Sequence, residues 1–156
     1  DAFPVYRENI NKIYLPRFYG IERYGRPSRD EICSSSKVEP IRNAPFVKQL
    51  RDYQIEVINQ YLTAVDHGNA LDTRGGIIQL GCGFGKTIMS INILAQLAKK
   101  TLIIVHKEFL LNQWIERIEE FCPNATIGRI QGPVFDIEGK DVVIGMLQRI
   151  VSNGSN

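Results

Sequence analysis

The apolar residues after Val47 recur with helical spacing in three segments. The first covers residues 50–68, where apolar positions follow the period of a helix and Gly68 is a stop signal. The second, residues 86–100, ends in two lysines, whose charge suits the negative end of a helix dipole. The third, residues 108–121, is amphipathic and stops before Pro123. These patterns predict three helices.

Short, continuously apolar runs lie between and after these helices, and such runs are typical of strands buried on both faces. They occur at residues 76–80, 101–106, 126–130 and 141–145. Strands that alternate with helices are joined by right-handed crossovers, which makes them neighbours in a parallel sheet. The predicted fold class is therefore α/β, a parallel sheet with helices on both faces.

The first 46 residues have a different composition, with five of the seven prolines and four of the six tyrosines. Residues 12–20 fit a strand interrupted at Pro16, and residues 23–30 fit a turn. We predict a small β-rich extension over residues 1–46 and one main domain over residues 47–156.

Composition excludes several other classes of protein. The chain has 156 residues, of which 44% are apolar and 23% charged, as in ordinary globular domains. No run of about 18 apolar residues occurs, so we expect no membrane partner. Three widely spaced cysteines and two isolated histidines do not form a zinc motif, and they favour a reducing, intracellular setting. The net charge of +2 does not decide for or against a nucleic-acid partner.

The segment LGCGFGKT, residues 80–87, places three glycines between a predicted strand and a predicted helix. Glycines let successive backbone N–H groups point into one concavity, and the helix start adds attraction for an anion. In such a loop Lys86 reaches the β- and γ-phosphates and the Thr87 hydroxyl ligates Mg²⁺. The sequence therefore predicts a site for ATP and Mg²⁺, with Lys86 and Thr87 as catalytic candidates and Thr87 as the metal ligand.

This loop resembles motif I of superfamily 2 helicases, in which the leading glycine of the strict template, here Leu80, is often replaced. It is most similar to the XPB-like group and to helicases of large cytoplasmic DNA viruses, of the poxvirus transcript-release type. The resemblance implies that residues 47–156 belong to the first RecA-like lobe of a P-loop NTPase, which works with a second RecA-like lobe. It also implies a location in the host cytoplasm or the virion.

The segment LRDYQ, residues 50–54, resembles the adenine-recognition element of the same family. The Gln54 amide donates and accepts at once, which matches an adenine edge, and the Arg51 guanidinium is suited to stacking on the base. An ordinary helix start with two solvated polar residues is the alternative, but the nearby phosphate loop favours the adenine role. The predicted nucleotide-binding residues are Arg51, Gln54, Gly81, Cys82, Gly83, Phe84, Gly85, Lys86, Thr87 and Ile88.

Three later segments resemble the parts of the family that contact a DNA or RNA strand, namely residues 101–114, 127–132 and 141–150. The implied contacts are His106, Lys107, Arg129, Gly132 and Gln148. A solvated turn explains His106 and Lys107 equally well, whereas Gln113 and Trp114 are expected to pack. In the N-terminal extension, arginines among aromatic residues fit either single-strand binding or a small packing module.

No apolar run in the sequence is followed by the Asp-Glu pair that ATP hydrolysis requires in this family. The expectation is an N-terminal fragment of an ATP-dependent helicase or translocase that is inactive by itself. A small P-loop phosphotransferase of the nucleoside kinase type is one alternative, although Arg117, Arg129 and Arg149 are scattered rather than grouped in a lid. A non-catalytic nucleic-acid-binding scaffold domain is another.

Overall fold

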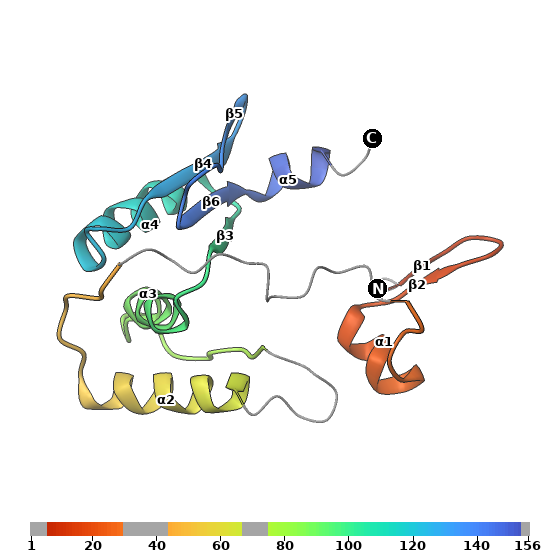
Figure 1. Ribbon diagram of the computed structural model, residues 1–156, viewed down its shortest axis with the longest axis horizontal. Coiled ribbons are helices and arrows are strands. Elements are labelled where there is room, and N and C mark those ends of the chain that lie inside the picture. Colours follow the sequence, from red (N-terminus) through yellow and green to blue (C-terminus); the bar gives the residue numbers. More distant parts are fainter. Residues whose placement is uncertain (1–5, 30–43, 67–74, 154–156) are drawn as a thin grey trace. The chain divides into compact units, whose positions relative to one another are not determined.

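A computed structural model describes residues 6–29, 44–66 and 75–153 of the chain (Figure 1). The chain forms two compact units. One comprises Asp1–Cys33 and Gln60–Ile77, and the other comprises Ser34–Asn59 and Ile78–Asn156. The predicted boundary after residue 46 stays a prediction, and Gly68, the predicted helix stop, lies outside the described residues.

The first unit contains a hairpin and a short helix. Strand β1 (Arg7–Glu8) pairs antiparallel with β2 (Ile13–Tyr14). Helix α1 (Arg17–Tyr24) follows Pro16 and ends at Gly25, whose φ of 81° is a left-handed conformation that favours glycine. The prediction that a strand resumes after Pro16 was wrong, because this proline stands at the entrance of a helix, where its fixed φ fits.

The second unit contains a four-stranded sheet in which three strands are parallel. In spatial order the strands are β3 (Thr101–Val105), β6 (Val142–Met146), β4 (Ile127–Gln131) and β5 (Val134–Asp136). The parallel pairs are β3 with β6 and β6 with β4, as the alternating pattern predicted. Strand β5 was not predicted and runs antiparallel to β4, which makes the sheet mixed. A turn at Gly132, with φ of 52°, joins the two.

Three predicted helices are present, and a fourth, short helix follows the last strand. They are α2 (Asp52–Asp66), α3 (Lys86–Leu97), α4 (Glu108–Phe121) and α5 (Leu147–Asn153). Lys99 and Lys100 were predicted in the last turn of α3, but that helix ends at Leu97. Ala98 adopts a left-handed conformation there, with φ of 49°, and turns the chain toward β3.

The hydrophobic core lies between helices α3 and α4 and one face of the sheet (Figure 1). Its fully buried members include Ile91 of α3, Leu111 and Ile118 of α4, and Val142 and Ile144 of β6. The other face carries α5. There Gly145 leaves room for the Ile150 side chain, since a Cβ at Gly145 would lie 2.7 Å from Ile150 Cδ1.

The strand predicted at residues 76–80 is not formed, and this part of the prediction was wrong. Residues 75–80 have no regular structure, and Ile77 is 95% exposed. A strand needs a neighbouring strand for its backbone hydrogen bonds, and none of the strands in the described ranges pairs with this segment. The apolar run has the composition of a buried strand, but composition does not show whether a neighbouring strand is available to pair with it.

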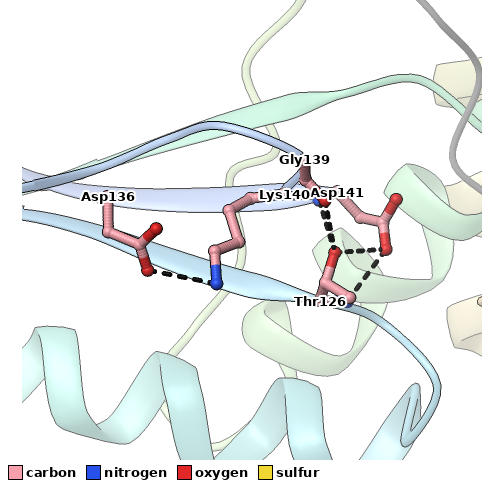
Figure 2. A network of polar contacts seen from close by, with 5 residues as sticks. All are labelled: Thr126, Asp136, Gly139, Lys140 and Asp141. Carbon is pink, nitrogen blue, oxygen red and sulfur yellow. Dashed lines mark hydrogen bonds and ion pairs between the residues drawn. The ribbon is translucent and has the colours of Figure 1, made fainter.

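A network of hydrogen bonds around Thr126 and Asp141 connects the amino ends of the three parallel strands (Figure 2). The buried carboxylate of Asp141 accepts hydrogen bonds from the backbone N–H and the hydroxyl of Thr126, both at 2.8 Å. The Thr126 carbonyl accepts from the N–H groups of Asp141 and Val142, and the Asp141 carbonyl accepts from that of Thr101. Beside this network Lys140 pairs with Asp136 at 3.1 Å. Asp141 therefore holds the amino ends of β3, β4 and β6 together.

Replacing Thr126 with valine tests this network. The change keeps the volume but removes the hydroxyl from a buried carboxylate, so we expect the free energy of unfolding to fall by about 1–3 kcal/mol. The matched control is Thr101→Val, which removes an exposed hydrogen bond to the Lys99 carbonyl and should change stability by less than about 0.5 kcal/mol. Urea denaturation measures both, and equal midpoints would contradict the role assigned to Asp141.

Candidate nucleotide-binding site

The glycine loop leads directly into helix α3. Gly83 and Gly85 have φ values of 82° and 78°, and Gly85 is the residue at which the helix starts. Lys86 turns its ammonium group back onto the loop and donates hydrogen bonds to the carbonyls of Leu80, at 3.0 Å, and Gly81, at 2.9 Å. A cation therefore lies beside the helix start, where the backbone N–H groups and the helix dipole also favour an anion.

Gln54 connects the start of helix α2 to this loop. Its side-chain oxygen accepts a hydrogen bond from the Arg51 N–H at 3.0 Å, which caps the helix. Its side-chain nitrogen donates to the carbonyl of Phe84 at 3.3 Å. The side chain is only 5% exposed, so the alternative of a solvated polar residue does not describe it. One acceptor position and one N–H of the amide are left for a further partner.

Gly85 makes this contact possible because it has no side chain. A Cβ at this position would lie 2.5 Å from the Gln54 nitrogen and 2.9 Å from Cγ2 of Ile88. The left-handed backbone conformation also disfavours any other residue. Space and backbone conformation therefore both require glycine at position 85.

Tyr53 is a contact of the loop that was not predicted from the sequence. Its hydroxyl donates to the Phe84 carbonyl at 3.2 Å, so this one carbonyl accepts from two neighbours on α2. The Tyr53 and Phe84 rings meet edge to face, with centroids 5.9 Å apart. The Phe84 ring also covers Gly81, where a Cβ would lie 3.2 Å from it. The sequence did contain a signal for this contact, namely a tyrosine next to Gln54 and a phenylalanine within the glycine loop.

Residues around the start of α2, in the glycine loop and on α4 border one cavity of about 610 Å³. Its lining includes seven of the predicted nucleotide-binding residues, namely Arg51, Gln54, Gly83, Gly85, Lys86, Thr87 and Ile88. Gly81, Cys82 and Phe84 belong to the loop but do not line the cavity. Four further lining residues were not predicted, namely Gln49, Gln113, Arg117 and Phe121. Gln113 was expected to pack but is exposed on the cavity wall, whereas Trp114 packs against the core.

The wall formed by the end of α4 carries a charge cluster. Arg117 and Lys48 both pair with Glu120, at 2.6 and 2.9 Å, and both cations lie within 6.0 Å of the Phe121 ring centre. Hydrogen bonds from Lys48 and then Arg117 lower the pKa of Glu120 below its ordinary value. The Arg117–Glu120 pair has the i,i+3 spacing of helix neighbours, whereas the Lys48–Glu120 pair joins residues that are distant in sequence.

The two cysteines in the described segments differ in their surroundings. Cys82 is exposed in the loop, and Cys122 is buried in the core, where desolvation raises the pKa of its thiol. The described part of the chain contains no group of three or more His, Cys, Asp or Glu side chains able to hold a metal ion.

The residues predicted to contact nucleic acid lie mostly at the carboxyl edge of the parallel strands. His106 follows β3, and its carbonyl accepts a hydrogen bond from Gln148, at the start of α5, at 3.1 Å. Lys107 stands at the start of α4, and Gly132 follows β4. Arg129 is exposed within β4 rather than at its end. The sheet thus gathers His106, Lys107, Gly132 and Gln148 at one edge, while their contact with nucleic acid stays a prediction.

Residues 47–155 match the family model described as "Type III restriction enzyme, res subunit". The whole chain aligns at 31% identity with "Putative ATP-dependent RNA helicase L396" of Acanthamoeba polyphaga mimivirus and covers 28% of that protein. It aligns over 121 residues at 35% identity with "Putative helicase 109L" of Invertebrate iridescent virus 3 and covers 33% of it.

A cellular relative matches over a shorter region. This is "DNA 3'-5' translocase XPB2" of Sulfurisphaera tokodaii, with 35% identity over 80 residues, 49% of this chain and 16% of that protein. The chain thus spans about a third or less of the length of these relatives. No helix in the described segments is long and apolar enough to cross a membrane. The matched region, the mostly parallel sheet and the loop before α3 together place this chain in the type III restriction enzyme res subunit family, as the N-terminal lobe of a superfamily 2 helicase.

Proposed function

We propose that this chain binds ATP with Mg²⁺ and contacts a nucleic-acid strand as part of a superfamily 2 helicase or translocase. The observation that carries the proposal is the junction of Gln54, Phe84 and Gly85. This junction joins the start of α2, with the Gln54 amide and the Arg51 guanidinium, to the glycine loop, with the Lys86 ammonium group and the backbone N–H groups at the start of α3. Both ends border one cavity of about 610 Å³, within the range of cofactor pockets.

Each part of the cavity suits one part of ATP. The remaining donor and acceptor of Gln54 match the adenine edge, and the exposed Arg51 lies beside them for stacking. Lys86 and the N–H groups at the start of α3 suit the phosphates, with the Thr87 hydroxyl as the Mg²⁺ ligand. ATP supplies the cleavable phosphoanhydride, and the metal ion neutralises charge on its phosphates.

The edge formed by His106, Lys107, Gly132 and Gln148 is the proposed track for a strand, with Arg129 nearby. Backbone N–H groups at the start of α4 and the Lys107 cation suit phosphates, which position a strand without reading its sequence. In this proposal a second RecA-like lobe faces the same edge and closes over ATP. The contacts suit DNA and RNA alike.

We propose further that the chain by itself binds ATP without hydrolysing it. Hydrolysis needs a carboxylate that orients the attacking water and holds Mg²⁺ through water. Asp141 is the acid closest to the apolar strand β6, but it lies at the amino end of that strand and is engaged with Thr126. It is therefore at the wrong edge of the sheet for this role.

Replacing Lys86 with alanine tests the phosphate site. A charge-assisted contact is worth about 1.5–3 kcal/mol, so affinity for a fluorescent ATP analogue should fall at least about tenfold. Lys99→Ala is the matched control. It removes the same charge from an exposed residue that lies beyond the end of α3. Equal losses in the two variants would mean that binding reflects net charge rather than a site.

The same measurement separates the alternatives. Absence of analogue binding by the unsubstituted chain would favour the scaffold alternative. Phosphoryl transfer from ATP to a nucleoside would favour the kinase. ATP turnover above that of Lys86→Ala, with or without nucleic acid, would contradict the proposal that this chain lacks the hydrolytic acid.

A comparison of Gly85→Ala with Gly83→Ala tests the junction. Both substitutions force alanine into a left-handed conformation, which costs about 1–2 kcal/mol. At Gly83 nothing lies within 4 Å of the new methyl group, whereas at Gly85 it meets Gln54 and Ile88. We expect Gly85→Ala to lower the free energy of unfolding by about a further 1–3 kcal/mol. Equal stability of the two variants would show that Gln54 does not approach Gly85 this closely.

A further inference from the structure

The first unit carries exposed tyrosines that its small size leaves unburied. Tyr6, Tyr19 and Tyr24 are 44%, 54% and 73% exposed. Among the residues of helix α1 whose burial is described, Ile21 is the buried apolar one. Of the two explanations open for this region, a packing module would bury its aromatic rings. The observed exposure therefore favours rings that are available to a ligand.

The three tyrosines line one shallow pocket of about 330 Å³. It lies between the hairpin and helix α1, and its remaining lining residues are Glu8, Ile13, Leu15 and Pro16. The walls are mainly aromatic and apolar, with hydroxyl groups and one carboxylate among them. This size is at the lower end for ligand pockets and suits a flat group such as a single nucleobase.

A second pocket of about 340 Å³ adjoins the first at Tyr24, which lines both. Its lining includes the cationic side chains of Arg17 and Arg26 together with the backbone around Gly25. One tyrosine thus separates an aromatic pocket from a basic one. A nucleotide has the same arrangement, with a planar base on one side of its sugar and an anionic phosphate on the other.

Charge is concentrated in this region of the chain. Residues 6–29 contain six basic and two acidic side chains, a net charge of +4, while the whole chain carries +2. The basic residues are Arg7, Lys12, Arg17, Arg23, Arg26 and Arg29. Such a local excess attracts a polyanion, although the overall charge of the chain does not.

We propose that residues 6–29 form a binding site for single-stranded nucleic acid, separate from the sheet edge. A base stacks on the tyrosines of the first pocket, and the neighbouring phosphate lies against Arg17 and Arg26. Bases are available for such stacking only in an unpaired strand, so the site prefers single strands to duplex. The unit that holds this site does not contain the glycine loop, so binding here needs no ATP.

The test measures binding of the chain to fluorescent oligothymidine and oligouridine probes of about six nucleotides, without nucleotide present. Tyr24→Ala should weaken binding about ten- to hundredfold, since each stacked base contributes strongly. Tyr24→Phe keeps the ring and should retain the affinity. The matched control is Tyr14→Ala, because Tyr14 is 55% exposed and lines neither pocket.

A second pair of variants tests the phosphate pocket. Arg26→Gln should reduce the slope of log affinity against log salt by about 0.7, as expected for one lost phosphate contact on a single strand. Arg23→Gln removes the same charge from a residue that lines neither pocket, and its slope should change less.

Three outcomes would overturn the proposal. One is the absence of single-strand binding by the unsubstituted chain, and another is tighter binding of duplex than of single strands. The third is an equal effect of Tyr24→Ala and Tyr14→Ala, which would leave the sheet edge or a protein partner as the explanation. Because the assay contains no ATP, these results are independent of the outcome at Lys86.

Discussion

The approach of the Gln54 amide to the backbone at Gly85 is the contact on which the proposed nucleotide site depends. Helix α2 and the glycine loop come from separate parts of the sequence, and this buried side chain bonds to both. The approach is possible only because position 85 carries no Cβ. With it, the Phe84 carbonyl accepts hydrogen bonds from Tyr53 and Gln54, and residues of α2 and of the glycine loop line one cavity. Without it, the two would be unrelated surface elements.

The two edges of the sheet differ in how their polar groups are bonded. At the amino ends of the strands, Thr126 and Asp141 form a partly buried network of hydrogen bonds, which joins the three parallel strands. At the carboxyl ends the polar groups are exposed, and turns rather than ladders carry them. This arrangement agrees with the general rule that open α/β sheets bind ligands beyond the carboxyl ends of their strands. A rigid amino edge lets the other edge carry loops without loss of strand order.

The sequence pattern predicted the elements whose formation depends on residues close together in the chain. The helices α2, α3 and α4 and the strands β3, β4 and β6 followed from periodicity, and the loop followed from its glycines and its lysine. Three features did not follow. Residues 76–80 lack a pairing strand, helix α1 depends on how Pro16 is used, and Arg117 reaches the cavity through its partners Glu120 and Phe121. The first two depend on an available pairing strand or on a choice between two conformations that the same residues allow. The third involves Lys48, which pairs with Glu120 from a distant part of the sequence.

The position of Lys86 has a consequence for any anion that enters the loop. Its ammonium group already has two acceptors, the carbonyls of Leu80 and Gly81, so phosphate binding is an exchange of partners rather than the capture of a bare charge. An internal competitor of this kind lowers net affinity, because the incoming oxygens replace bonds that exist already. It also assists departure, since the cation regains its carbonyls as the anion leaves. In the proposed ATP-dependent role, an attraction that is partly satisfied beforehand favours release of the nucleotide.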